Sequence, residues 1–363
     1  MRREGRRDEI GSEYHWEPSA LLDAPHHRLP DGHRLFATAT GALRALLRQL
    51  APAGRLHVPT YFCTGVAEAL AECVPIAWYQ HLPLRDGPDL ETLHARPGDV
   101  VLAQNLFGVE DPRPWREWIA AHPGVPVVED HSHDPFGDWA RHSTAAYAVA
   151  SLRKTLPLPD GGLLWSPSGR PLPGPDGPES RGAAQKLAAM LLKAAWRDGR
   201  PVAKGDFRAL QQHGERALLC SAGPASAVTA ALLPLLDVAG LRDRGRAAAG
   251  SLRHELLSRT RKEFDLVVEG PFRLPLACAS ETARDALLAH LARHRIFAPV
   301  HWRQERRGWW SGDRAAAALA ARMLTLPVDH RCSSEDVQRI AHVMVEFTDL
   351  ASCESKVGHI VVA

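Results

Sequence analysis

The chain lacks long apolar runs and any large excess of one charge. No stretch reaches the roughly 20 consecutive apolar residues that a membrane-spanning helix needs, so we expect no membrane span. Its 44 Lys and Arg residues nearly balance its 42 Asp and Glu residues, which leaves a formal net charge of +2. So small an excess gives no electrostatic reason to expect a nucleic-acid partner.

Cysteine is sparse, and its six positions show no close pairing: Cys63, Cys73, Cys220, Cys278, Cys332 and Cys353. This scatter predicts reduced, mostly packed thiols. The first residues, from Arg2 to Arg7, are basic but lack the apolar core of a signal peptide. We therefore expect a cytoplasmic protein.

The apolar sequence that is present suffices for a large domain and a smaller one, since the chain has 363 residues and 45% of them are hydrophobic. From about residue 38 onward, helix-like segments alternate with short apolar strands, among them 76–79, 100–104 and 127–129. This alternation predicts an α/β fold with a mostly parallel, doubly wound sheet in the large domain.

The C-terminal part predicts a smaller α/β domain. A long helical stretch runs from about 225 to 261, with a charged interruption at 243–246. Strands at 265–268, 277–279 and 297–300 and helices at 281–293, 313–323 and 334–348 follow. We place the large domain at 35–244 and the small domain at 245–363, and we expect segment 1–34 to pack on the small domain or on a dimer partner.

The segment Val127–His133 ends an apolar strand with the acidic residue Asp130. About two dozen positions later, Lys154 lies in a turn that Gly161 and Gly162 end. Ligands of doubly wound sheets bind beyond the carboxyl ends of the strands, where both side chains are expected. This layout suits an aromatic cofactor cation that is held at one end and bonded through its aldehyde at the other.

The pattern resembles the pyridoxal-phosphate (PLP) enzymes of fold type I, and within them the sugar aminotransferase-like family named for DegT, DnrJ, EryC1 and StrS. The resemblance implies that Lys154 forms the Schiff base with PLP and that Asp130 faces the pyridine nitrogen. His133, three positions after the aspartate, matches the family's Gln or His near the ring hydroxyl. The seven-residue spacing from Lys154 to Gly161 also matches the family.

The same resemblance implies a phosphate site. The segment Thr38–Leu43 opens a helix and is similar to the family's phosphate cup, with Thr40 and the Gly41 amide as candidate donors. Ser151 is a further candidate phosphate ligand. An ordinary threonine N-cap at this helix would look the same from the sequence.

Aromatic and amide contacts follow from the resemblance as well. Tyr61 or Phe62 occupies the place of the family's ring-stacking aromatic, with core packing as the alternative for either. Asn105, in a turn similar to the family's His-x-Phe/Tyr-Gly, would lie close to cofactor or substrate.

The family resemblance implies a homodimer that uses a small-molecule amino donor and a keto acceptor. The Asn- and Arg-containing segment that relatives lend across the dimer is missing here, where Ser221–Ala227 stands in its place. PLP-dependent elimination, decarboxylation, aldol cleavage or bond formation is the alternative to transamination.

Two rivals come from other classes. Asp130, His131, His133 and Asp134 are dense in metal-ligand types, so a metal-dependent enzyme is one alternative. A cofactor-binding protein without turnover is another, although the paired Asp130 and Lys154 argue against it.

Overall fold

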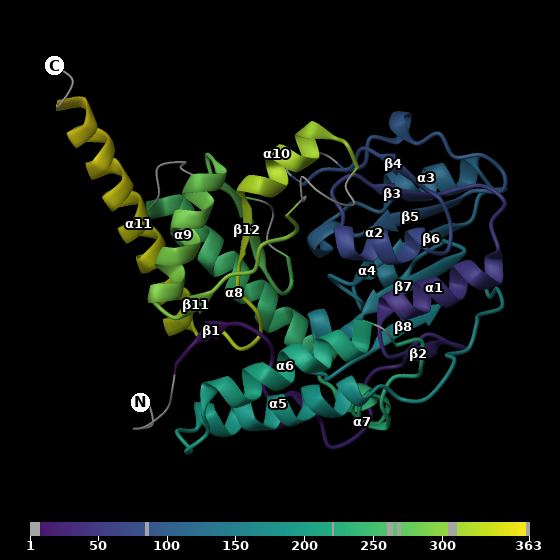
Figure 1. Cartoon of the computed structure of the whole chain (residues 1–363), viewed down its shortest axis with the longest axis horizontal. Helices are drawn as coiled ribbons and strands as arrows, with labels where there is room; N and C mark the ends of the chain where they lie inside the picture. The colour runs from purple at the N-terminus through teal and green to yellow at the C-terminus, as the bar shows by residue number, and fades with distance from the viewer. Residues whose placement is uncertain are drawn as a thin grey trace. The chain divides into compact units, whose positions relative to one another are not determined.

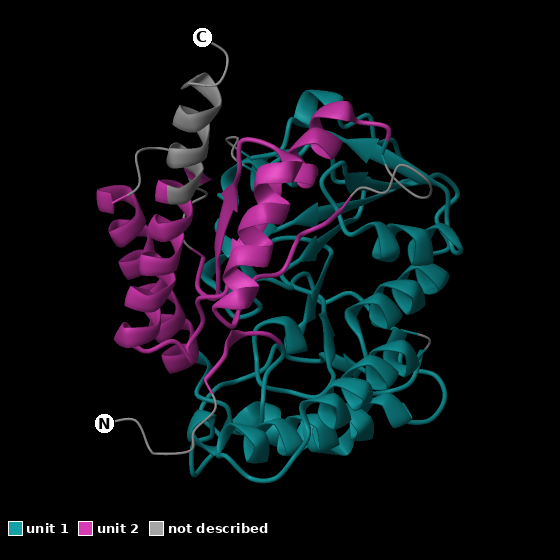
Figure 2. Ribbon diagram, turned by 60° about the vertical axis from the view of Figure 1, so that its left-hand side comes forward, with its two compact units in different colours: residues 1–7, 13–238, 305–311 teal, residues 8–12, 239–304, 312–363 magenta. Residues whose placement is uncertain are grey.

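The structure is a computed structural model that describes residues 8–83, 87–219, 221–259, 264–266, 270–303 and 311–360, with backbone only over 350–360. The chain divides into two compact units, coloured separately in Figure 2. Unit 1 comprises residues 1–7, 13–238 and 305–311, and unit 2 comprises 8–12, 239–304 and 312–363.

Unit 1 is built around a seven-stranded sheet with the strand order β2-β8-β7-β6-β5-β3-β4 (Figure 1). The strands are β2 Arg34–Phe36, β3 Leu56–Pro59, β4 Ile76–Tyr79, β5 Val100–Gln104, β6 Val127–Asp130, β7 Tyr147–Ser151 and β8 Gly162–Trp165. The pairs from β7 to β4 are all parallel, and β8 runs antiparallel to both β7 and β2. The predicted mostly parallel sheet is therefore confirmed.

Both faces of this sheet are covered, which explains why its strands are mostly apolar. On one face, Val128 packs in a buried cluster with residues of α1 Ala39–Leu50 and α2 Thr64–Ala71. On the other, Val127 packs with the tryptophans of α3 Arg113–Ala121 and α4 Asp138–Arg141. Adjacent residues of β6 thus point to opposite faces, as the pleat requires.

Two long helices, α5 Arg181–Arg197 and α6 Lys204–Leu219, pack side by side in unit 1. Helix α7 Ala227–Leu232 follows them. The short 3-10 helices of the unit are η1 Pro18–Ala20, η2 Leu90–Thr92, η3 Leu106–Gly108, η4 Leu152–Lys154 and η5 Leu233–Leu235.

Unit 2 packs its helices against a three-stranded antiparallel sheet of order β12-β10-β9 and a parallel pair, β1 with β11. The strands are β1 Ile10–Gly11, β9 Asp265–Leu266, β10 Leu274–Ala277, β11 Ile296–Phe297 and β12 Met323–Leu326. The helices are α8 Val238–Arg259, α9 Glu281–Arg293, α10 Arg314–Arg322 and α11 Ser334–Ile360.

Three details of the sequence prediction for this region are wrong. The strand expected at 297–300 is observed at Ile296–Phe297. The long helical stretch is interrupted around Pro234, in η5, and not at 243–246, which lies inside α8. The strand expected at 277–279 is observed at Leu274–Ala277. Of the strand expected at 265–268, positions 267 and 268 lie outside the described residues.

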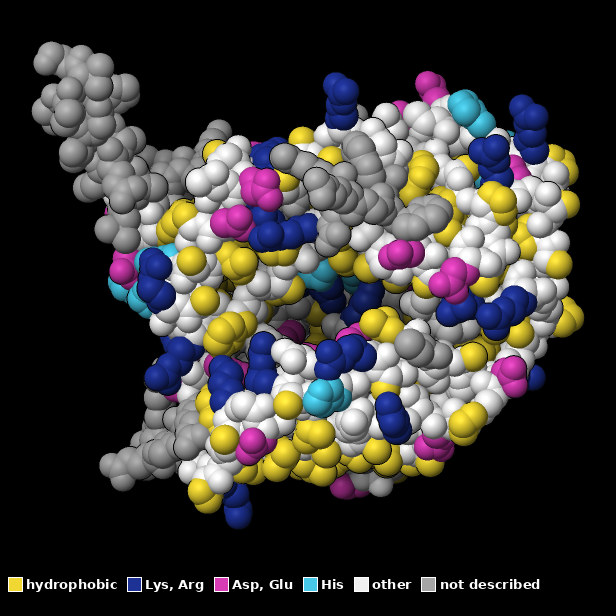
Figure 3. Space-filling model, viewed as in Figure 1, with side chains coloured by type: hydrophobic (Ala, Val, Ile, Leu, Met, Phe, Trp, Pro, Cys, Tyr) yellow, Lys and Arg dark blue, Asp and Glu magenta, His cyan; other side chains and the backbone are white. Residues whose placement is uncertain are grey.

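Among the helices that the structure describes, none combines the length and apolarity needed to cross a bilayer. Positively and negatively charged side chains are interspersed over the face shown in Figure 3, in keeping with the small net charge.

Candidate functional site

The candidate site is organised by the carboxyl ends of two adjacent parallel strands. β6 ends at Asp130 and β7 at Ser151, and Asp130 is in register with Val149. Val149 belongs to the buried cluster under α1 and α2, so Asp130 and Ser151 lie on the face that α1 covers. The Ser151 N–H donates to Ser132 Oγ at 2.8 Å, which ties the two strand ends together.

Asp130 is held in one orientation by its own turn. Its Oδ1 accepts the Ser132 N–H at 2.8 Å, and the side chain is buried. Within the described part of the chain no donor contacts Oδ2, so this oxygen can still accept a hydrogen bond from a ligand. The Asn105 N–H donates to the Asp130 carbonyl oxygen at 3.0 Å, which fixes β5 beside β6 at this edge.

His133 lies against the turn that follows β5. The Phe107 N–H donates to His133 Nδ1 at 2.8 Å, and the two rings stack at 5.5 Å between centroids with 7° between their planes. A backbone N–H can only donate, so Nδ1 is unprotonated and the ring proton of His133 is on Nε2. Gly108, with φ of +77°, approaches so closely that a Cβ there would lie 2.9 Å from the His133 carbonyl oxygen.

The Asn105 side chain stabilises this turn. Its side-chain oxygen accepts the Glu110 N–H at 3.3 Å, and the residue is buried. The residue of the turn that contacts His133 is Phe107, which sequence reasoning did not select. The sequence feature that could have identified Phe107 was the similarity of the turn to the family's His-x-Phe/Tyr-Gly pattern.

The two aromatic candidates after β3 are both buried but pack differently. Phe62 belongs to the cluster under α1 and α2, as the core-packing alternative expects. Tyr61 lies edge-on to Phe107 at 6.4 Å between ring centroids. Tyr61, Phe107 and His133 therefore form a continuous aromatic row beside the strand ends.

The start of helix α1 lies next to the end of the lysine turn. Gly161 N–H donates to the Ala37 carbonyl oxygen at 2.9 Å, and a Cβ on Gly162 would lie 2.2 Å from the Thr38 carbonyl carbon. Gly162 is in turn paired with Ser151. Only a glycine allows this approach, which brings the positive end of α1 to Ser151.

The N-cap of α1 is Thr38, whose Oγ1 accepts the Gly41 N–H at 3.0 Å. The Gly41 amide thus has an acceptor within the protein, and its role as a phosphate donor stays a prediction. Thr40 is half-buried at the second helical position. The amides of Ala39 and Thr40 have no acceptor within the helix, as in any first turn.

Lys154 is the last residue of η4, which directly follows β7. The turn is closed by Leu152 N–H, which donates to the Gly161 carbonyl oxygen at 3.0 Å. Gly161 has φ of +124°, a conformation that side chains rarely adopt. The Lys154 side chain is exposed, so it can extend from a rigid turn.

A partly buried ion network anchors the residue before Lys154. Both terminal nitrogens of Arg153 donate to Glu215 of α6, at 2.7 and 2.6 Å. Lys186 Nζ of α5 lies 2.9 Å from Glu215 and 2.9 Å from Glu13. Burial would raise the pKa of Glu215, but Arg153 and Lys186 outweigh it and lower that pKa to about 2. No sequence pattern pointed to Glu215.

The other end of the lysine turn is anchored by Asp160. Its carboxylate accepts from the Ser226 N–H and hydroxyl, each at 2.8 Å, and from the Thr229 hydroxyl of α7. Burial raises the pKa of Asp160 more than these hydrogen bonds lower it. The turn is thus held at one end by the half-buried carboxylate of Glu215 and at the other by the buried carboxylate of Asp160.

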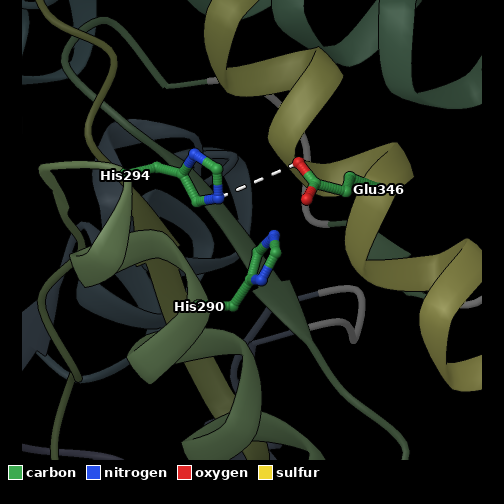
Figure 4. Close-up of side chains that lie close together, drawn as sticks. All are labelled: His290, His294 and Glu346. Atoms are coloured by element: carbon green, nitrogen blue, oxygen red, sulfur yellow. Dashed lines mark ion pairs between the residues drawn. The ribbon is translucent and has the colours of Figure 1, made fainter.

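The metal alternative lacks the geometry it needs. His131 Nε2 lies 2.9 Å from Glu129 Oε2 in a buried pair, and its ring contacts Trp139 and Trp165. This pair points away from the face of Asp130, because successive residues of a strand alternate. In the described chain, the three-residue group with metal-binding spacing is instead His290, His294 and Glu346 of unit 2 (Figure 4).

No protein-family model matches the chain, and no curated protein matches it. Solved structures do match in fold. PseC from Helicobacter pylori, an aminotransferase involved in pseudoaminic acid biosynthesis, is 14% identical with a TM-score of 0.60, covering 94% of this chain and 99% of its own. A DegT DnrJ EryC1 StrS aminotransferase from Brucella abortus is 16% identical with a TM-score of 0.58, covering 87% of this chain and 85% of its own.

A third similar structure is the sugar aminotransferase CalS13 from Micromonospora echinospora. It is 16% identical with a TM-score of 0.55, and the match covers 86% of this chain and 87% of that one. The shared architecture confirms the predicted fold, that of the fold type I PLP-dependent transferases.

Proposed function

We propose that this chain is a PLP-dependent aminotransferase that moves an amino group from an amino-acid donor to a keto sugar or another biosynthetic ketone. The observation that carries the proposal is the placement of Asp130 and the Lys154 turn. They end adjacent strands at the edge where α1 begins, in a fold shared with sugar aminotransferases. Similarity of fold alone would be weaker support for this function, because one fold can carry many unrelated functions.

The residues present fit PLP. Asp130 Oδ2 is available for the pyridine N–H, and the Nε2–H of His133 can donate to the ring oxygen. Thr40, Ser151 and the first amides of α1 offer donors to the phosphate. Tyr61, which lies edge-on to Phe107, would lie near the cofactor ring.

Lys154 is the best placed lysine to anchor the cofactor aldehyde. Of the other lysine side chains that the structure describes, Lys186 and Lys193 are buried on α5, where each contacts Glu13, and Lys204 begins α6. Only Lys154 in this group follows the carboxyl end of a sheet strand.

When bound, PLP supplies a protonated aromatic ring that withdraws electrons from the substrate carbon. The Asp130 carboxylate would keep the proton on the ring nitrogen, because its negative charge favours the protonated form. Lys154 Nζ would take the proton from the substrate carbon that bears the nitrogen and return it to the carbon on the other side of that nitrogen, as general base and then acid. His133, whose Nδ1 accepts the Phe107 N–H, would direct its Nε2 proton toward the ring oxygen.

We further propose that the enzyme is cytoplasmic and works as a homodimer. A small-molecule amino donor and a keto acceptor would be its partners. Elimination, decarboxylation, aldol cleavage or bond formation on PLP would use the same residues and is the second candidate function.

A donor panel separates these two functions. Purified protein with PLP is incubated with each amino acid, and 2-oxo acid formation is followed by NMR. A stoichiometric yield of oxo acid per site, becoming catalytic on addition of a keto acceptor, supports transamination. Release of carbon dioxide, water or an aldehyde from the substrate, without oxo acid, would favour the second candidate.

A further inference from the structure

Three potential metal ligands converge from two helices of unit 2. His290 lies near the end of α9 and His294 directly follows it, four residues on, while Glu346 belongs to α11. Their ligand atoms all lie within 4.8 Å of one another, and Figure 4 shows the three side chains pointing toward one another. This group takes no part in the proposed aminotransferase site.

The spacing of the two histidines suits a shared metal ion. Residues four apart occupy one face of a helix, as in helical zinc motifs. The His290 and His294 ring centroids are 4.8 Å apart, and His294 Nε2 lies 3.8 Å from Glu346 Oε2. Ligands about 2.1 Å from a tetrahedral zinc ion lie roughly 3.4 Å from each other, so only small movements are needed.

The ligand side chains that must move to bind the ion are the two that are exposed to solvent. His290 is 3% exposed and serves as the fixed ligand. The side chains of His294 and Glu346 are 36% and 43% exposed, so each can change rotamer without disturbing the core. The helices are already joined at this point, since Arg339 of α11 donates to the His294 carbonyl oxygen.

An ion bound through Nε2 has to displace two existing contacts of His290. Nε2 lies 3.2 Å from the Val343 carbonyl oxygen, and Nδ1 lies 3.3 Å from an Arg293 nitrogen. The carbonyl can only accept, so Nε2 carries the proton before metal binds. Binding through Nε2 moves that proton to Nδ1 and releases Arg293, which is exposed and can turn to solvent.

We propose that His290, His294 and Glu346 form a binding site for a divalent transition-metal ion of the Zn²⁺ class, which links α9 to α11. Two imidazoles and one carboxylate are ligands that Zn²⁺ prefers, and water completes its coordination. The ion stabilises unit 2, because it binds the folded arrangement and not the unfolded chain.

The test is calorimetric titration of the full-length, metal-free protein with ZnCl₂, together with thermal unfolding with and without the metal. The variants His294→Ala and Glu346→Gln remove half-exposed ligands. His213→Gln, at an exposed position on α6, removes one histidine elsewhere and is the matched control. Such a control is needed because the chain has 19 histidines.

We expect one Zn²⁺ per wild-type chain and a higher melting temperature with zinc. His294→Ala and Glu346→Gln should each weaken binding at least about tenfold and lose the zinc-dependent rise in melting temperature. His213→Gln should behave as wild type. Absence of zinc binding by the wild type, or equal binding by all variants, would overturn the proposal.

Discussion

Arg153 and Glu215 form a two-bond ion pair that fixes the residue before Lys154 to helix α6. The pair joins positions far apart in the sequence and continues through Lys186 to Glu13. The geometry makes Arg153 a structural anchor. The orientation of the Lys154 turn therefore depends on a carboxylate of helix α6.

Glu215→Gln should loosen this anchor. Loss of the carboxylate leaves Arg153 and the buried Lys186 without a shared counter-charge, at a cost of about 1–3 kcal/mol in the free energy of unfolding. Urea unfolding at pH 7 measures this cost. Asp206→Asn, at an exposed position on the same helix, is the matched control, because it also replaces one carboxylate by an amide. Equal stability of Glu215→Gln and wild type would contradict the anchoring role.

The same carboxylate gives a pH dependence. The pKa of Glu215 falls from 4.5 to about 2 on folding, so the unfolded state binds the proton more tightly. Its stabilising contribution is therefore complete above about pH 5 and is lost as the pH falls toward 2. Unfolding free energies across this window should drop more steeply for wild type than for Glu215→Gln. Parallel profiles for the two proteins would argue against the ion pair.

Gly162→Ala should separate α1 from the lysine turn. Its Cβ would lie 2.2 Å from backbone atoms of Thr38, which cannot move without shifting the helix start. We expect a loss of about 1–3 kcal/mol in stability and weaker PLP binding. Gly174→Ala is the matched control, because in the described chain a Cβ at that loop position would meet no atom within 4 Å beyond its two sequence neighbours. PLP titration followed by absorbance compares the PLP affinities of the two variants, and urea unfolding compares their stabilities. Equal affinity and equal stability would contradict the close approach of Gly162 to the start of α1.

Asp130→Asn should retain the fold and lose the chemistry. The amide oxygen can still accept the Ser132 N–H, so the turn is preserved, but the negative charge that holds the ring proton is gone. We expect turnover to fall on the order of 100-fold or more. Steady-state kinetics with saturating PLP measures the effect, and a near-normal rate would remove Asp130 from its proposed role.

Much of the architecture was predictable because local signals agree with the final packing. The strands Ile76–Tyr79 and Val100–Gln104 and the helix Glu281–Arg293 have the bounds expected from their apolar patterns. The break in the long helix was predicted at the wrong position for a physical reason. The charged residues Asp243, Arg244 and Arg246 are exposed on α8 and do not interrupt it, whereas Pro234 does end the helix before it.

Other features needed the tertiary structure. Helix α6 contains two glycines, which lower its helix propensity. One of them, Gly214, allows close contact with Gly182 of α5. A Cβ on Gly182 would lie 2.5 Å from the Gly214 carbonyl oxygen. At α1, the sequence offers two threonines as caps, and only the structure identifies Thr38. The network around Glu215 joins three distant segments and has no local signature.

The most direct test of the account is reduction of the protein with borohydride after incubation with PLP, followed by mass mapping of the label. The chain has six lysines, so the modified position can be assigned peptide by peptide. We expect a violet-region absorbance band that disappears on reduction, with the pyridoxyl mass on Lys154. We also expect that Lys154→Ala folds normally, takes no label and has no turnover. A label on another lysine, or a protein that takes up no PLP, would contradict the central claim.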